Sequence, residues 1–166
     1  MHEIRSEFWL PVSLEKVWAF FSDASNLAKI SPKFLGLVVE GDSKTVQGST
    51  VHLNFHPLGL PFALKWDSLI ENVHESEGEK SFVDVQSKGF FKSWTHTHSF
   101  RAGVKSIGKI QISENGTWCR DHVQYELPLD FMELGNNLVV TRALGSMFAQ
   151  RKKALYEHFR CMNFAN

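Results

Sequence analysis

The sequence holds few cysteines and no surplus of either charge. Its 166 residues include two cysteines, Cys119 and Cys161, whose spacing fits no metal-binding motif, so we expect free thiols in a reducing compartment. Lysine and arginine together number 18, as do aspartate and glutamate, and no basic run resembles a phosphate-binding stripe. This balance argues against a nucleic-acid partner.

Long apolar runs and linkers are also missing. No stretch approaches the ~18 apolar residues that a membrane-spanning helix requires. Residues 1–7 alternate charged and apolar types, which is not the pattern of a signal peptide. No repeat, low-complexity tract or linker divides the chain. We therefore expect one cytoplasmic domain over residues 1–166, with no integral membrane association, no cofactor and no resident metal.

Phenylalanine and tryptophan are abundant, whereas tyrosine is scarce. Fourteen Phe and five Trp stand against two Tyr. This bias provides large apolar surfaces with few hydroxyl groups. Either a phenylalanine-rich core or an apolar cavity would use such surfaces, and composition alone does not separate the two.

Hydrophobic spacing predicts an α+β domain in which a sheet curls around a helix. A strand over 4–10 is followed by a helix that starts after Ser13 and a second short helix that starts after Asp23. The period is helical again over 131–159, a length of ~40 Å that can cross a whole sheet. Between these helices we expect a turn at Glu114-Asn115-Gly116 and antiparallel strands at 51–56, 62–70, 82–88, 93–100 and 119–126.

The segment 82–100 has the most informative pattern in the chain. Read with a period of two, it is a strand, a glycine turn and a second strand. Its aromatic face also carries Asp84 and Gln86 on the first strand, and His96 and His98 on the second. Because each buried polar group needs a partner, this face is unlike a plain core and indicates a pocket.

Closure of this hairpin about Gly89 would pair Asp84 with His96 across the two strands. The last strand would neighbour the histidine strand on its other side and bring Asp121 close. His96 and His98 would then lie between two carboxylates. Four interpretations stay open: a satisfied buried network, recognition of a ligand's polar group, general acid–base catalysis, and metal binding.

Several segments, spread in order along nearly the whole chain, carry a family resemblance. They are Val17–Asp23 with Asn26–Leu27 and Ile30–Pro32, Phe82–Gln86, Trp94–Phe100, Asp121–Pro128 and Phe148–Arg151. In this order they resemble the START-like superfamily, also called SRPBCC. That superfamily joins START lipid-transfer domains, pollen-allergen-type plant carriers, polyketide cyclases and coenzyme-Q carriers. The chain is most similar to its small bacterial ligand-binding members.

The resemblance implies a helix-grip fold. In this fold a seven-stranded antiparallel sheet wraps around the long C-terminal helix, two short helices follow the first strand, and a cavity lies between sheet and helix. It also implies a small hydrophobic ligand, in many members without catalysis. The chain departs from the pattern where Gly89-Phe90-Phe91 replaces a Gly-Pro start of the hairpin loop, and where the span from Phe100 to Asp121 is about ten residues longer than usual.

We expect the cavity wall to combine aromatic surface with polar groups that orient a ligand. The expected ligand-binding residues are Phe55, Trp66, Phe82, Asp84, Gln86, Phe90, Phe91, Trp94, His96, His98, Asp121 and Tyr125. Arg151, on the long helix, is expected to pair with a carboxylate.

The first functional prediction is non-catalytic binding, carriage or sensing of a small hydrophobic molecule. One alternative is a cyclase- or dehydratase-like enzyme that uses His96 or His98, with the neighbouring aspartates, as an acid–base group. No nucleophile or oxyanion hole is legible beside them. A second alternative is a protein-interaction module that exposes Phe90 and Phe91.

Overall fold

Seven antiparallel strands and a long C-terminal helix make up most of the protein, as the family resemblance implies. The computed structural model describes residues 1–57, 61–107, 110–128 and 137–163. The strands form one sheet in the order β1-β7-β6-β5-β4-β3-β2. Their bounds are β1 His2–Leu10, β2 Leu37–Glu40, β3 Thr50–Phe55, β4 Leu64–Glu75, β5 Glu79–Lys88, β6 Ser93–Ile107 and β7 Ile110–Glu126. The helices are α1 Leu14–Phe21, η1 Ala24–Asn26, α2 Leu27–Ile30, η2 Lys33–Leu35 and α4 Asn137–Asn163.

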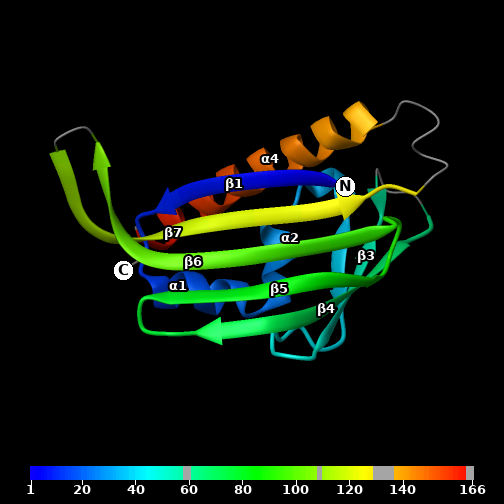
Figure 1. Cartoon of the computed structure of the whole chain (residues 1–166), viewed down its shortest axis with the longest axis horizontal. Coiled ribbons are helices and arrows are strands. Elements are labelled where there is room, and N and C mark those ends of the chain that lie inside the picture. Colours follow the sequence, from blue (N-terminus) through cyan, green and yellow to red (C-terminus); the bar gives the residue numbers. More distant parts are fainter. Residues whose placement is uncertain (58–60, 108–109, 129–136, 164–166) are drawn as a thin grey trace.

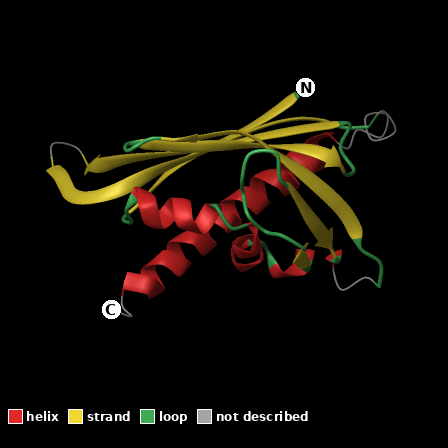
Figure 2. Cartoon of the chain, turned by 90° about the horizontal axis from the view of Figure 1, so that it is seen from below, coloured by secondary structure: helices red, strands yellow, loops and turns green. Residues whose placement is uncertain are grey.

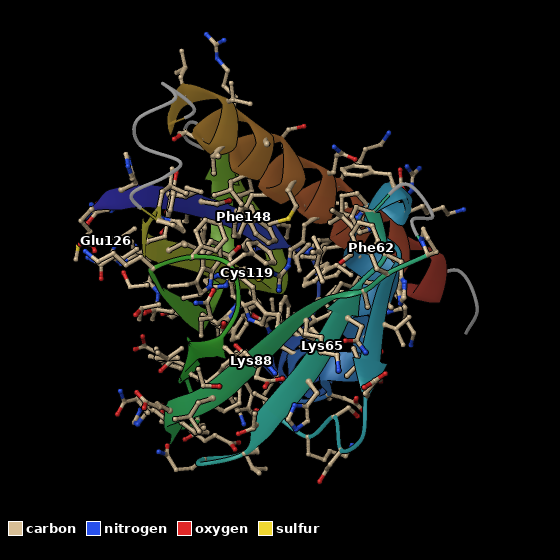
Figure 3. All side chains as sticks on the ribbon, turned by 90° about the vertical axis from the view of Figure 1, so that its right-hand side faces the viewer. Phe62, Lys65, Lys88, Cys119, Glu126 and Phe148 are labelled. Carbon is tan, nitrogen blue, oxygen red and sulfur yellow. The ribbon has the colours of Figure 1, made fainter. Side chains whose placement is uncertain are left out.

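The helices all lie on one face of the sheet. Figure 1 shows α4 crossing behind the strands, and Figure 2 shows the strands as a curved layer with the helices packed beneath it. The apolar core lies between these layers, where Phe148 of α4 and Cys119 of β7 are both buried (Figure 3). The predicted helix-grip architecture is therefore confirmed. No helix in the described residues is long and apolar enough to span a membrane.

The first helices begin where their capping residues predict. Ser13 has an extended backbone, and its carbonyl accepts the first intrahelical hydrogen bond of α1, from Val17 N at 3.1 Å. Asp23 Oδ1 accepts a hydrogen bond from Ser25 N at 3.0 Å and caps η1, which leads directly into α2. These caps place Phe20 near the end of α1, where its ring packs against Phe159 of α4 with centroids 5.4 Å apart. The predicted start of the long helix, at 131, lies outside the described residues.

The hairpin of β5 and β6 has the predicted register. Asp84 pairs with His96, and Phe82 pairs with His98. The side-chain amide of Gln86 closes the turn, because its Nε2 donates to Phe91 O at 2.8 Å and its Oε1 accepts from Phe91 N at 3.2 Å. The connection is therefore held by a side chain as well as by the two strands.

The turn predicted at Glu114-Asn115-Gly116 is wrong. These residues lie inside β7, where Gly116 pairs with Gly103 of β6. A Cβ atom at Gly116 would meet the Trp9 ring and the Leu10 carbonyl, so this glycine permits close packing against β1 rather than a chain reversal. The connection between β6 and β7 falls at 108–109, outside the described residues, and the lengthened hairpin extends beyond the rest of the sheet (Figure 1).

The predicted start of the strand at 62–70 is also wrong. β4 begins at Leu64, and Phe62 precedes it with 56% of its surface exposed. Trp66, Ser68 and Ile70 are buried on the inner face, as the alternating pattern requires. The apolar alternation continues back to Phe62, directly after Pro61, but the backbone enters the strand only at Leu64.

Candidate functional site

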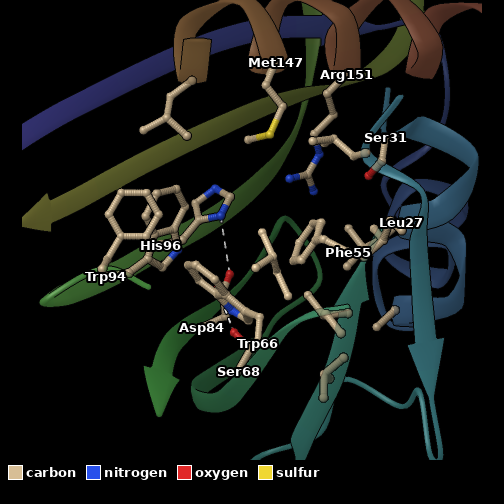
Figure 4. A pocket seen from close by; sticks show the side chains of 18 of the residues that line it. Leu27, Ser31, Phe55, Trp66, Ser68, Asp84, Trp94, His96, Met147 and Arg151 are labelled. Carbon is tan, nitrogen blue, oxygen red and sulfur yellow. Dashed lines mark hydrogen bonds and ion pairs between the residues drawn. The ribbon is translucent and has the colours of Figure 1, made fainter. Parts of the chain in front are cut away.

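A cavity of about 490 Å³ lies between the inner face of the sheet and the helices. Its volume falls within the ~300–1,000 Å³ typical of small-molecule sites. Strands β3 to β6 supply one side, and α1, α2 and α4 supply the other (Figure 4). Most lining residues are apolar; the polar or charged ones are Asp23, Asn26, Ser31, Thr45, Ser68, Asp84, His96, His98 and Arg151.

Aromatic rings form a continuous part of the wall near the β5–β6 turn. Trp66 lies at the centre of this group, with ring centroids 5.4 Å from Trp94, 5.1 Å from Phe90 and 5.8 Å from Phe91. Phe55 of β3 contacts Phe90 edge to face at 6.3 Å. All five residues line the cavity, so this region offers an apolar molecule both ring faces and ring edges.

The cavity opens to solvent where its wall is itself exposed. Phe34, Leu64, Phe90 and Val139 line the cavity, yet each has at least 41% of its surface exposed. They come from η2, β4, the β5–β6 turn and the first turn of α4. Phe91 instead packs inward against Trp94 and Tyr125. The two phenylalanines of the turn therefore do not form one exposed patch.

Two histidines and two aspartates form a closed buried network beside the cavity. Asp84 Oδ2 lies 3.0 Å from His98 Nε2 and 3.4 Å from His96 Nδ1. Asp121 Oδ1 lies 3.1 Å from His96 Nε2 and 3.2 Å from His98 Nδ1. The imidazole centroids are 3.7 Å apart, and Ser68 Oγ donates to Asp84 Oδ1 at 2.9 Å. Each imidazole thus bridges both carboxylates.

The network holds its groups in different protonation states. Burial, reinforced by the neighbouring His98, lowers the pKa of His96 and outweighs the two carboxylates. Burial also opposes the charge of His98, but hydrogen bonds to Asp121 and Asp84 prevail and raise its pKa. The pKa of each aspartate is lowered despite burial, because both imidazoles face it. These directions favour ionised aspartates and a proton on His98 in preference to His96.

Three members of this network could also hold a cation. The donor atoms of Asp84, His96 and His98 lie within 4.8 Å of one another. These residue types suit a transition metal such as zinc. Each of the three already contacts a partner in the network, so metal binding would replace existing hydrogen bonds rather than fill free coordination positions.

Arg151 also lines the cavity, and the predicted ion pair with a carboxylate is wrong. Among the residues that the structure describes, no carboxylate lies within 4.0 Å of its guanidinium, and Nε and Nη2 are buried without a hydrogen-bond partner. The guanidinium lies over the Phe21 ring, 5.6 Å from the centroid. Its charge helps to lower the pKa of Asp121 without touching that residue.

The structure brings together nine of the twelve residues predicted to bind a ligand. These nine line the cavity: Phe55, Trp66, Phe82, Asp84, Phe90, Phe91, Trp94, His96 and His98. Gln86, Asp121 and Tyr125 lie outside the wall. Gln86 closes the turn, Asp121 contacts the imidazoles from β7, and the Tyr125 hydroxyl lies 3.0 Å from Thr141 Oγ1 of α4.

Sequence reasoning missed the side of the cavity that the helices supply. From the sequence, Arg151 is expected only to pair with a carboxylate and is not among the residues predicted to bind a ligand. It is four residues from both Met147 and Leu155, which belong to the apolar stripe of the same helix. This i, i+4 spacing places the arginine on the inward face and could have identified it.

Comparison with known proteins relates the chain to one family and one fold. The model of the family described as polyketide cyclase/dehydrase and lipid transport matches residues 10–155. No curated protein matches the sequence. A START superfamily protein from Mycobacterium smegmatis is similar in structure, with a TM-score of 0.65, 14% identity, and coverage of 98% of this chain and 99% of that one.

Two further solved structures have the same fold. Protein Ms6760 from Mycobacterium smegmatis gives a TM-score of 0.62 at 15% identity, covering 96% of this chain and 92% of that one. Norcoclaurine synthase from Thalictrum flavum, in complex with dopamine and hydroxybenzaldehyde, gives a TM-score of 0.55 at 18% identity. The match covers 95% of this chain and 87% of that one. At these identities the similarity establishes the fold, which both an enzyme and proteins with no stated activity share.

Proposed function

The chain belongs to the polyketide cyclase/dehydrase and lipid transport family, and from this premise we propose that it binds and carries a small hydrophobic molecule in the cavity between the sheet and α4. The observation that carries this proposal is the cavity of about 490 Å³ with its mostly apolar wall. An apolar molecule that enters it would gain roughly 25 cal/mol for each Å² of apolar surface removed from water. Carriage requires no reaction at the buried network.

The first experiment is native mass spectrometry of the purified protein, followed by organic extraction of whatever it releases. A stoichiometric apolar adduct supports the proposal. Because an emptied protein would also give a clean mass, binding of the neutral fluorescent probe N-phenyl-1-naphthylamine is then titrated. Trp66 and Trp94 lie in the wall, so energy transfer from tryptophan to the probe reports occupancy. Absence of saturable one-to-one binding in both measurements would refute the proposal.

A matched pair of variants localises the binding. Trp94→Ala removes wall surface; a loss of about 60 Å² of apolar contact would weaken binding about tenfold. Trp118→Ala removes the same side chain from β7 at a position outside the wall, where the indole donates to Val104 O at 3.4 Å. Equal loss of probe affinity in the two variants would show that binding does not occur in this cavity.

A second candidate function is acid–base catalysis of the cyclase or dehydratase kind. It is favoured by the position of Asp84 and His96 in the cavity wall and by the lowered pKa of His96, which leaves this imidazole able to accept a proton. The enzyme hypothesis predicts that His96→Gln abolishes turnover of a cyclisable substrate and preserves affinity for the neutral probe. Under the carrier hypothesis, the same variant changes stability and pH response only.

A further inference from the structure

We propose that the ligand of this cavity is an amphipathic anion whose charged end pairs with the Arg151 guanidinium. The inference rests on the proposed function and adds the chemical class of the molecule carried. Carboxylate, sulfonate, sulfate and phosphate ends share the required chemistry, which is two or more anionic oxygens that accept hydrogen bonds from a planar guanidinium. The apolar body would lie against the aromatic wall.

The unpaired charge of Arg151 carries the argument. Arginine stays protonated in proteins, so its guanidinium brings a full positive charge to the cavity wall. Two of its nitrogens, Nε and Nη2, are shielded from solvent without a hydrogen-bond partner. Arg151 as a whole is half-buried, but shielding these two nitrogens from water without a partner is costly, and the Phe21 ring face compensates only part of that cost. An anion in the cavity would supply the partner that the chain itself does not.

The acidic residues nearby are already committed to other partners. Asp84 and Asp121 are each held between two imidazoles at 3.0–3.4 Å. Asp23, the remaining acidic residue of the wall, accepts hydrogen bonds from Ser25 and Ser43 and pairs with Lys44 at 3.1 Å. The protein therefore offers a ligand anion no internal competitor that must first be displaced.

Charge selectivity follows from the composition of the wall. Among the lining residues that the structure describes, Arg151 is the only lysine or arginine. Figure 4 shows it projecting from α4 into the cavity, opposite the strands that carry Trp66 and Asp84. The charges of Asp84 and His98 oppose each other at 3.0 Å, and Asp23 pairs with Lys44, so among the described wall residues Arg151 is the charge left without a partner of opposite sign. It would select one anionic group on an otherwise apolar molecule, because any further charge would be buried unpaired.

The test compares two fluorescent probes that differ by one group. 1-Anilinonaphthalene-8-sulfonate is N-phenyl-1-naphthylamine with an added sulfonate, which stays ionised at every working pH. Each probe is titrated into wild type, Arg151→Met and Arg142→Met. Methionine keeps an unbranched apolar stem of similar length, and Arg142 is an exposed arginine of the same helix outside the cavity wall. The expected result is a 10- to 100-fold loss of sulfonate affinity in Arg151→Met alone, since a charged hydrogen-bonded pair is lost. Affinity for the neutral probe should change less than about threefold.

Each outcome bears on a different claim. Selective loss of the sulfonate probe in Arg151→Met supports the anion inference. Equal response of the two probes, or equal loss in both variants, overturns it and leaves the carrier function standing. Failure of wild type to bind either probe overturns the carrier function together with the inference. If Arg151→Met does not fold, the test is the ratio of the affinities of the two probes for the wild-type protein. A sulfonate probe that binds wild type no more tightly than its neutral analogue overturns the inference.

Discussion

Asp121→Asn tests whether the buried network is ionised as the geometry indicates. Asparagine keeps the size of the side chain and one oxygen acceptor but removes the charge that faces both imidazoles. At 3.2 Å and an effective dielectric constant near 20, a carboxylate and an imidazolium attract by about 5 kcal/mol. The carboxylate's own desolvation penalty, relieved in the variant, offsets part of this. We therefore expect a loss of about 3–5 kcal/mol in the free energy of unfolding at pH 7.5.

The assay is urea unfolding followed by circular dichroism, with the midpoint and the slope fitted separately. A shifted midpoint at constant slope identifies a change in stability rather than in the unfolded state. The melting temperature should fall by roughly 6–20 °C for a chain of this length. Glu7→Gln is the control, because its carboxylate pairs with Arg120 at the exposed outer surface, where such pairs contribute at most about 1 kcal/mol.

A loss below about 1 kcal/mol in Asp121→Asn would refute this reasoning. It would mean that the imidazoles are neutral and that hydrogen bonds alone hold them. The double variant Asp121→Asn/His98→Gln adds a second criterion. If charge couples the two residues, the sum of the stability losses in the two single variants exceeds the loss in the double variant.

Three further predictions concern the buried network, the packing of β7 against β1 and the β5–β6 turn. Below pH 6.5 the unfolded chain takes up a proton on His96 that the folded chain does not, so the contribution of His96 to stability should fall on acidification, approaching about 1.4 kcal/mol per pH unit. The raised pKa of His98 acts in the opposite direction near pH 6.5 and offsets part of this fall, so His96→Gln should remove the fall that wild type shows by urea unfolding between pH 6.5 and 5.5. Gly116→Ala should lower the melting temperature by roughly 5 °C or more because its Cβ meets the Trp9 ring, whereas Gly78→Ala, with no neighbour within 4 Å, should change it little. Gln86→Ala should cost about 1–3 kcal/mol in the same assay, since two hydrogen bonds across the turn are lost; an unchanged midpoint would show that the clamp contributes nothing.

The network was predictable because two local rules suffice to build it. Strand alternation places Asp84 and His96 on inward faces, and a turn about Gly89 fixes which residues pair. The neighbouring position of the last strand then brings Asp121 to the other side of the histidines. The observed register agrees with each of these steps.

The errors arose where a local signal competed with tertiary packing. Asn115-Gly116 is a strong turn signal, but the glycine is required by the ring of Trp9, which is distant in sequence. Strand β2, Leu37–Glu40, was not identified because four residues carry too little periodicity. The helical side of the cavity was missed at Arg151, because arginine side chains are mostly exposed in proteins and its place on the apolar stripe of α4 was not weighed against that tendency.

The polar groups around the cavity can be sorted by whether the chain itself satisfies them. Both aspartates of the network and both imidazoles contact one another within 3.4 Å, so most of their cost of burial is met within the fold, although His98 Nδ1 makes only a 3.2 Å charge contact with Asp121 Oδ1 and no hydrogen bond. Such a group needs no ligand and can position strands β5, β6 and β7. Arg151 differs because its charge reaches the cavity with two nitrogens unpaired. A polar group retained at such a cost without an internal partner is the better candidate for ligand recognition. On this criterion we assign the histidines, which dominate the sequence pattern, to maintenance of the fold, and we propose the arginine as the residue that selects the ligand.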